Sequence, residues 1–253
     1  MINQKQKSNK KYIATIAVLA VLTVGTIIST ACLAWSLAVA NEKIDYLQAK
    51  IDDLENSGAI EPGVIDYGDY VVKKPLIYLY PSEDTQVSVK VGNPSELTST
   101  YPKYSDGWNV LAHKDGSLVG ANGRSYYGLY WEGAHYPAAQ TDEGFVVAAS
   151  DTEAFLEEKL AQLGLTEREA NEMIIYWLPQ LEKSAYNYIR FDLNDVMDEY
   201  MSLHVSPQPD TMIRVSMVFK GLTAPIAVRE QKLPIASERS GFVLVEWGGC
   251  EIK

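Results

Sequence analysis

Cysteine is nearly absent from this 253-residue sequence, which contains only Cys32 and Cys250. Cys32 lies inside a long apolar segment, so the rest of the chain holds a single cysteine and is not expected to form an internal disulfide. A chain of this length buries enough apolar surface to fold without disulfides or structural metals. The fold is therefore expected to depend on its hydrophobic core.

Positive charge and phosphate-binding glycine motifs are also scarce. The chain has 22 Lys and Arg against 33 Asp and Glu, a net charge of −11. An acidic surface repels phosphate groups, so nucleic acid is not expected as a partner. The sequence has no G-x-x-x-x-G-K-[ST] motif, and no G-x-G-x-x-G motif between a strand and a helix. Nucleotide sites of the P-loop and Rossmann types are therefore not predicted, and no cofactor is expected.

Histidine is limited to His113, His135 and His204. None of them has the i,i+4 spacing of the zinc motif H-E-x-x-H. Glu132 and His135 are three residues apart in a predicted loop that could surround an ion. The candidate metal ligands are therefore Glu132 and the three histidines. Isolated surface histidines are commoner than ligands, so we predict no metal site.

Charge is absent from residues 13–40, which are rich in Val, Ile, Leu and Ala. A membrane-spanning helix needs about 20 apolar residues. Residues 1–12 carry four lysines, and acidic residues follow the run, so the positive-inside rule places the N-terminus in the cytoplasm. The sequence predicts a single-pass plasma-membrane protein with a signal anchor and an extracytoplasmic C-terminal domain. In the alternative, cleavage after Ala40 releases that domain.

The segment after residue 40 is predicted to be a stalk followed by a linker. Residues 41–56 contain a two-heptad apolar seam, which indicates a short coiled coil and a weak homodimer; its members are Ile44, Leu47, Ile51 and Leu54. Residues 57–74 are rich in Gly and Pro and are typical of a linker. Low cysteine use outside the cytoplasm is typical of envelope proteins of Gram-positive bacteria, which is the origin we expect.

Residues 75–253 are predicted to form one α+β domain. Apolar residues alternate from Leu76 to Trp131, and Asp115-Gly116 and Asn122-Gly123 favour hairpin turns, so this part is predicted to be an antiparallel β-meander. Two central helices are expected next, the first ending at Gly164 and the second beginning with a capping box of Thr166 and Glu169. Further strands follow them, which favours α+β over a repeated βαβ arrangement.

Four blocks of sequence carry a resemblance. They are Lys74-Pro75-Leu76-Ile77-Tyr78-Leu79-Tyr80-Pro81, Trp131-Glu132-Gly133, Tyr176-Trp177-Leu178-Pro179 and Glu246-Trp247-Gly248-Gly249. Their order and spacing resemble an uncharacterised domain of Firmicutes and other microbes, over roughly residues 74–252. The resemblance implies one domain with these boundaries. It implies no activity, cofactor or catalytic residue.

Tyr126, Tyr130 and Glu132 are predicted to share one face of a strand over residues 125–132, with Gly128 leaving room between the two tyrosines. Aromatic planes beside a carboxylate are suited to a sugar ligand, and His135 follows closely. These four residues are the predicted ligand site of a domain that binds an envelope glycan or a protein.

The alternative function is an envelope glycan hydrolase. Glu132 and Glu246 each end a predicted strand beside a tryptophan. Two carboxylates that flank a cleft can act as acid and base on a glycosidic bond. Cys250 follows two glycines that would expose its thiol, but the adjacent Glu251 disfavours the thiolate, so a passive role is predicted for this cysteine.

Overall fold

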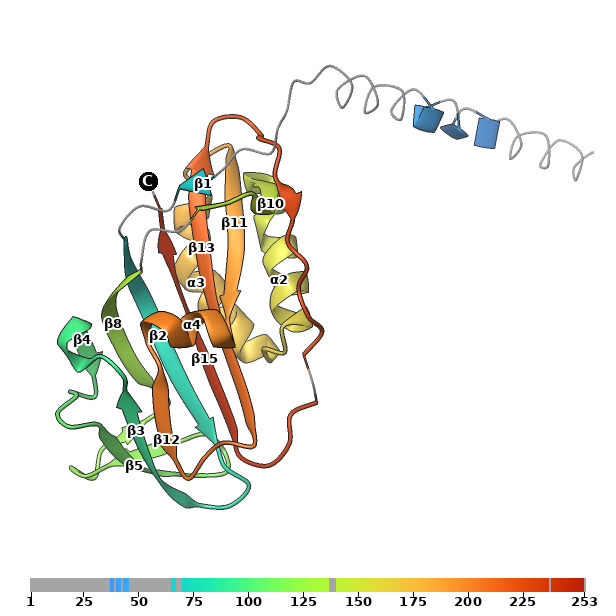
Figure 1. Ribbon diagram of the computed structural model, residues 1–253. Helices are drawn as coiled ribbons and strands as arrows, with labels where there is room; N and C mark the ends of the chain where they lie inside the picture. The colour runs from blue at the N-terminus through green and yellow to red at the C-terminus, as the bar shows by residue number, and fades with distance from the viewer. Residues whose placement is uncertain are drawn as a thin grey trace, which may run out of the picture. The chain divides into compact units, whose positions relative to one another are not determined.

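A computed structural model describes residues 37, 38, 40, 41, 43–45, 65, 66, 70–136, 140–236 and 238–252 (Figure 1). The chain divides into two compact units, Met1–Glu61 and Pro62–Lys253. The second unit contains the whole of the predicted domain.

In the described part of the chain, no helix has the length and apolar character needed to cross a membrane. This finding corrects the predicted fold class, which placed a transmembrane helix and a helical stalk before the domain, and with it the single-pass and signal-anchor predictions. Most of residues 13–40 and 41–56 lie outside the described residues. The predicted linker 57–74 ends too late, because a strand already begins at Tyr70.

The second unit is mostly β-sheet, and its larger sheet has eight strands. In spatial order these are β14 (Arg229–Glu230), β10 (Glu143–Ala148), β11 (Tyr186–Leu193), β13 (Thr211–Leu222), β15 (Val243–Glu251), β2 (Tyr70–Tyr80), β8 (Leu129–Tyr136) and β4 (Leu97–Tyr101). β13 and β15 run parallel, as do β10 and β14, and the remaining neighbours are antiparallel.

The smaller sheet has five strands. Their order is β12 (Leu203–Ser206), β3 (Thr85–Val91), β5 (Trp108–Ala112), β6 (Leu118–Gly120) and β7 (Ser125–Tyr126). A separate two-residue pairing joins β1 (Ile65–Asp66) to β9 (Gln140–Thr141). The helical elements are η1 (Pro94–Glu96), η2 (Ala149–Asp151), α2 (Thr152–Gln162), α3 (Glu167–Leu181) and α4 (Asn194–Tyr200).

The predicted meander is wrong as a description of the domain. Within residues 76–131, only β5, β6 and β7 are paired in the order of the chain, because β4 lies between β3 and β5 in sequence but joins the larger sheet. β2 pairs with the last strand, β15, at the centre of the large sheet. The single strand predicted over residues 125–132 is divided by a bend at Tyr127-Gly128 into β7 and β8, which belong to different sheets. Local alternation identifies strands but carries no information on which distant strand each one pairs with.

Local signals did locate α2 and α3, whereas α4 was not predicted. Thr166 accepts a hydrogen bond from the backbone N–H of Glu169, whose side chain accepts one from Thr166 N–H, which completes the predicted capping box. α3 then continues through Pro179 to Leu181, so residues 174–178 are helical.

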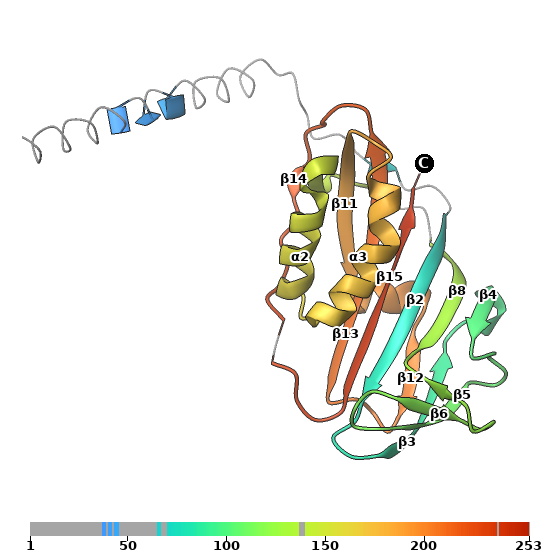
Figure 2. The ribbon, with the colours of Figure 1, turned by 180° about the vertical axis from the view of Figure 1, so that it is seen from behind.

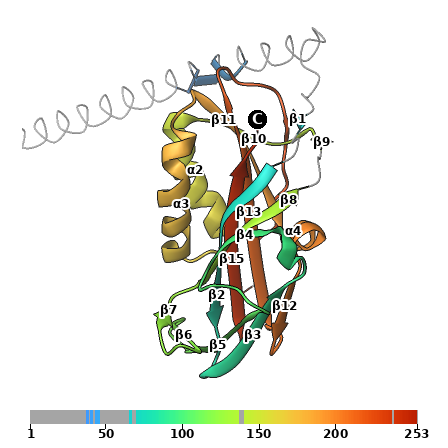
Figure 3. The ribbon, with the colours of Figure 1, turned by 90° about the vertical axis from the view of Figure 1, so that its left-hand side faces the viewer.

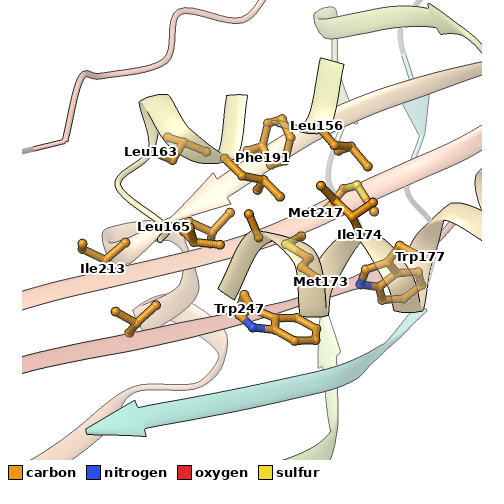
Figure 4. Close-up of a cluster of buried hydrophobic side chains, with 14 of the residues drawn as sticks. Leu156, Leu163, Leu165, Met173, Ile174, Trp177, Phe191, Ile213, Met217 and Trp247 are labelled. Atoms are coloured by element: carbon orange, nitrogen blue, oxygen red, sulfur yellow. The ribbon is translucent and has the colours of Figure 1, made fainter. Parts of the chain in front are cut away.

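The large sheet separates two hydrophobic clusters. On one face, α2 and α3 pack on the sheet through residues that include Leu156, Met173, Trp177 and Trp247 (Figure 4). On the other face, the five-stranded sheet and α4 enclose a second cluster (Figure 3). Because successive side chains of a strand point to opposite faces, Leu76 and Tyr78 join the first cluster and Ile77 and Leu79 join the second.

Figure 2 shows that α2 and α3 lie over β11, β13 and β15, with β2, β8 and β4 beyond α3. On the helix side, Leu76 and Tyr78 of β2 are buried, whereas side chains of β8 and β4 are partly or largely exposed. The candidate functional site lies there.

Candidate functional site

A bulge in β2 is the centre of the candidate site. The pairing of β2 with β8 shifts between Val72 and Leu76, where residues 73–75 of β2 lie opposite only two residues of β8, so the strand bulges by one residue. Lys74 within it has a φ of 62°, in the left-handed region that a residue with a Cβ rarely adopts. Bulges of this kind redirect side chains and are common beside functional sites.

The bulge directs Lys74 towards β8 and α3. Its backbone N–H donates to Oε1 of Glu132 over 3.3 Å. Its Nζ lies 5.5 Å from the ring centroid of Tyr130 and 5.3 Å from that of Tyr176. Both distances are within the range of a cation–π interaction. A cation, two aromatic rings and a carboxylate thus meet beside the end of α3.

Two glycines of β15 let the neighbouring backbone come this close. A Cβ added to Gly248 would lie 3.0 Å from Cγ of Pro75, and one added to Gly249 would lie 3.1 Å from the ring of Trp177. Residues from all four sequence blocks therefore meet around the bulge of β2. The blocks are far apart in the chain, so only the tertiary structure brings them together.

The site extends across β8 and β4 as a row of tyrosines. Tyr130 is the direct cross-strand neighbour of Tyr101, and Glu132 is that of Ser99, so all four face the same side. The ring of Tyr126 contacts Tyr101 with a centroid distance of 5.4 Å. We call this surface the tyrosine face; it comprises Tyr101, Tyr127, Tyr130 and Tyr176.

Two members of the tyrosine face are strongly exposed. Tyr101 and Tyr127 leave 52% and 53% of their surface accessible, which is unusual for residues that carry so much apolar area. Tyr127 lies 6.5 Å, centroid to centroid, from the buried ring of Tyr78, which holds it on the helix side. Exposed aromatic surface on a rigid sheet is a common feature of ligand-binding surfaces.

The phenols of Tyr130 and Tyr176 stay protonated at neutral pH. Burial, followed by a hydrogen bond and charge repulsion from Glu132, raises the pKa of Tyr130 to about 12. Burial and the charge of Glu132 also raise the pKa of Tyr176. Neutral phenols keep an O–H donor and an acceptor oxygen, so these residues can hydrogen-bond a ligand and stack on it.

The predicted ligand residues come together in part. Tyr130 and Glu132 are neighbours on β8, as expected. Tyr126 on β7 contacts Tyr101 but packs against the cluster between the two sheets, so it does not share their face. Gly128 does not make room between tyrosines: a Cβ there would lie 2.9 Å from the side chain of Leu76. His135 lies in β8 opposite Val71, and its side chain falls outside the described residues.

Glu246 lies in the interior of the domain and has no access to a ligand. It is fully buried, accepts from Trp131 Nε1 at 2.7 Å, and forms an ion pair with the fully buried Arg214. Arg214 also contacts Asp198 and donates to the carbonyl of Met201 in and after α4. Glu246 therefore ties α4 to the sheet.

The positions of Glu132 and Glu246 do not support the alternative function of a glycan hydrolase. Trp131, which binds Glu246, points to the α4 side of the sheet, whereas the adjacent Glu132 points to the α3 side beside Tyr130. The two carboxylates lie on opposite faces of the large sheet. They cannot act together on one glycosidic bond, which requires both in one cleft.

The candidate metal residues are also dispersed. His113 Nδ1 lies 2.8 Å from Asp84, and His204 lies on β12 opposite Lys90. Among the residues that the structure describes, no three His, Cys, Asp or Glu side chains gather in a way that could hold a metal ion. Cys250 is buried in the cluster between the two sheets.

Sequence reasoning missed four residues of the site: Lys74, Tyr101, Tyr127 and Tyr176. Lys74 and Tyr176 do belong to two of the quoted sequence blocks, which was the available signal. Tyr101 and Tyr127 carried no comparable signal, because their exposure depends on the strand order β2-β8-β4.

Comparison with known proteins gives a short local match. Over 63 residues the chain is 43% identical to an "uncharacterized protein in bglA 3′ region" of Butyrivibrio fibrisolvens, covering 24% of this chain and 65% of that relative. The chain thus spans less than two thirds of the relative's length. No family model and no solved structure matches the chain. The family resemblance of the four blocks stays a prediction.

Proposed function

We propose that residues 70–252 form a binding domain whose tyrosine face holds a glycan chain. The observation that carries the proposal is the group of tyrosines on β4, β8, α3 and the bend before β8, in which Tyr101 and Tyr127 are about half exposed. A sugar ring offers C–H bonds to an aromatic plane and hydroxyl groups to the polar atoms around it. Tyrosine supplies both kinds of contact from one side chain.

Polar groups lie at the right place to bind sugar hydroxyls. Ser99 and Glu132 face each other across β4 and β8, next to the pair formed by Tyr101 and Tyr130. These groups supply donors and acceptors beside the rings. A surface built on paired strands loses little conformational entropy on binding, which favours affinity.

Charge favours a neutral or cationic glycan over an anionic polymer. The net charge of −11 repels polyanions at a distance. A teichoic-acid-like polymer and nucleic acid are therefore disfavoured ligands. A hydrolytic function is not proposed, because Glu132 and Glu246 lie on opposite faces of the sheet.

A glycan panel on the full-length protein tests the proposal. Neutral oligosaccharides and peptidoglycan fragments should bind, and Tyr101→Ala and Tyr127→Ala should each weaken binding by about 1–3 kcal/mol without loss of stability, because both rings are exposed. Affinity is measured by calorimetry and folding by circular dichroism.

Tyr186→Ala is the matched control. Tyr186 is a partly exposed tyrosine on β11, three strands from β2 in the large sheet, and its loss should leave glycan affinity unchanged. If a well-folded protein bound none of the glycans, the proposal would be wrong and a protein ligand would become the better account.

A further inference from the structure

The two rings and the carboxylate beside Lys74 have the composition of a cation site. The Lys74 ammonium lies over Tyr130 and Tyr176 at 5.5 and 5.3 Å, and the charge of Glu132 acts on both phenols. Aromatic faces carry negative charge density, and a nearby carboxylate strengthens their attraction for a cation. The described structure already shows one ammonium group in this position.

We propose that Tyr130, Tyr176 and Glu132 form a cage for a ligand's ammonium group, and that the glycan is an amino sugar polymer with free 2-amino groups. The inference rests on the proposed glycan function and specifies its ligand. In this arrangement the sugar rings stack on the exposed Tyr101 and Tyr127, and one protonated amine enters the cage. Lys74 is the internal occupant that the amine displaces.

Lys74 is suited to be displaced. It is only partly buried, its Nζ contacts are with ring faces, and its backbone is held in a left-handed conformation by the bulge. A lysine side chain has four flexible carbons and regains solvation and rotamer freedom when it leaves the rings. The backbone N–H of Lys74 stays on Glu132 during this exchange and keeps the carboxylate in place.

Charge complementarity distinguishes this amino sugar polymer from glycans with other substituents at carbon 2. A glycan with 2-hydroxyl or 2-acetamido groups offers the cage no cation, whereas one with a free amine does. The acidic chain also attracts a cationic polymer at long range, so the test has to separate the cage from the net charge.

Three β-1,4-linked hexasaccharides make the comparison sharp because they differ only at carbon 2: glucose, N-acetylglucosamine and glucosamine hexamers. Calorimetry on the full-length protein, at a pH at which the amines are protonated, should give about three- to tenfold tighter binding for the glucosamine hexamer. The preference should persist at high salt and disappear when the amines are deprotonated.

Substitutions test whether the cage causes the preference for the glucosamine hexamer. Glu132→Gln should abolish it, whereas Glu230→Gln, which removes the same charge from exposed β14, should preserve it. Lys74→Met should tighten binding of the glucosamine hexamer, because the competing ammonium is gone. Tyr176→Leu should lower the preference while neutral hexamers still bind.

The outcomes separate the two proposals. Equal affinity for the three hexamers, with weakening by Tyr101→Ala, would overturn the cation site and leave the glycan function standing. Equal effects of Glu132→Gln and Glu230→Gln would also overturn it, since net charge would then explain the preference. Weaker binding in Lys74→Met would mean that Lys74 contacts the ligand and is not displaced. Failure of all three hexamers to bind would remove both proposals.

Discussion

Lys74 and Glu246 show how differently single residues are used in this domain. Lys74 keeps a left-handed backbone because Glu132 accepts its N–H and Pro75 packs on the backbone of β15. Strained conformations of this kind persist where the surroundings impose them, and they concentrate at functional sites. Glu246, which is adjacent to Trp247 in the sequence, is instead buried and bound by Arg214 and Trp131. Lys74 is therefore accessible to a ligand, whereas Glu246 stabilises the fold.

At this scale we predict that Glu246→Ala destabilises the domain by about 3 kcal/mol. The substitution leaves the buried Arg214 with Asp198 as its remaining acidic partner, and a buried charge without full compensation is costly. Urea unfolding at pH 7 measures the change in the free energy of unfolding. Glu230→Gln on exposed β14 is the control, with an expected change below about 0.5 kcal/mol. A stable Glu246→Ala protein would show that the network contributes little.

At the scale of elements, α3 is positioned by its first turn and by the segment after β14. Arg239 donates to Glu169 and to the carbonyl of Gly164, and Glu169 also accepts from the backbone of Thr166. One buried carboxylate thus joins the capping box of α3 to a residue 70 positions away. Because α3 carries Tyr176, this contact also places one wall of the proposed cage.

The same contact predicts acid sensitivity. Burial acts to raise the pKa of Glu169, but the Arg239 guanidinium and the Thr166 N–H outweigh it, so the pKa lies below its usual value. A carboxylate with a depressed folded-state pKa stabilises the protein above its unfolded-state pKa, and that stability is lost as the pH falls through the folded-state value. Urea unfolding from pH 7 to pH 3 should show this loss.

Glu169→Gln tests the assignment. The variant should be less stable than the wild type at pH 7, and the difference should shrink towards pH 3 because the wild-type carboxylate is then protonated. The variant Glu167→Gln, at the start of the same helix, is the control and should keep the wild-type pH dependence. A constant difference between wild type and Glu169→Gln across this range would contradict the prediction.

For the whole molecule, the large sheet couples two hydrophobic clusters. β2, β13 and β15 each contribute alternate residues to the cluster under α2 and α3 and to the cluster beneath the smaller sheet. Neither cluster can lose its sheet face while the other stays intact. We therefore predict a single cooperative unfolding transition for this unit.

Two core substitutions test this prediction. Leu160→Ala lies in the helix-side cluster and Leu118→Ala in the other, and both side chains are fully buried. Each should lower the free energy of unfolding by about 2–5 kcal/mol and shift the tryptophan-fluorescence and far-ultraviolet transitions together. Separate midpoints in either variant would mean that the two layers fold independently.

The sequence by itself determined the local features of this protein. Asp115-Gly116 and Asn122-Gly123 predicted turns, and both glycines have the positive φ that such turns need. Thr166 and Glu169 predicted the start of α3, and Tyr130 and Glu132 were placed side by side on one strand. Each of these features depends on residues a few positions apart, whose contacts follow from backbone geometry.

Only the tertiary structure decided the mostly β architecture and the composition of the site. The pairing of β2 with β15, the bulge that turns Lys74 towards Tyr176, and the burial of Glu246 all join residues far apart in the chain. Alternating apolar residues specify that a strand has a buried face, but many distant strands could satisfy it equally well. The partner is selected by the packing of the whole core, and with it the side of the sheet on which each carboxylate lies.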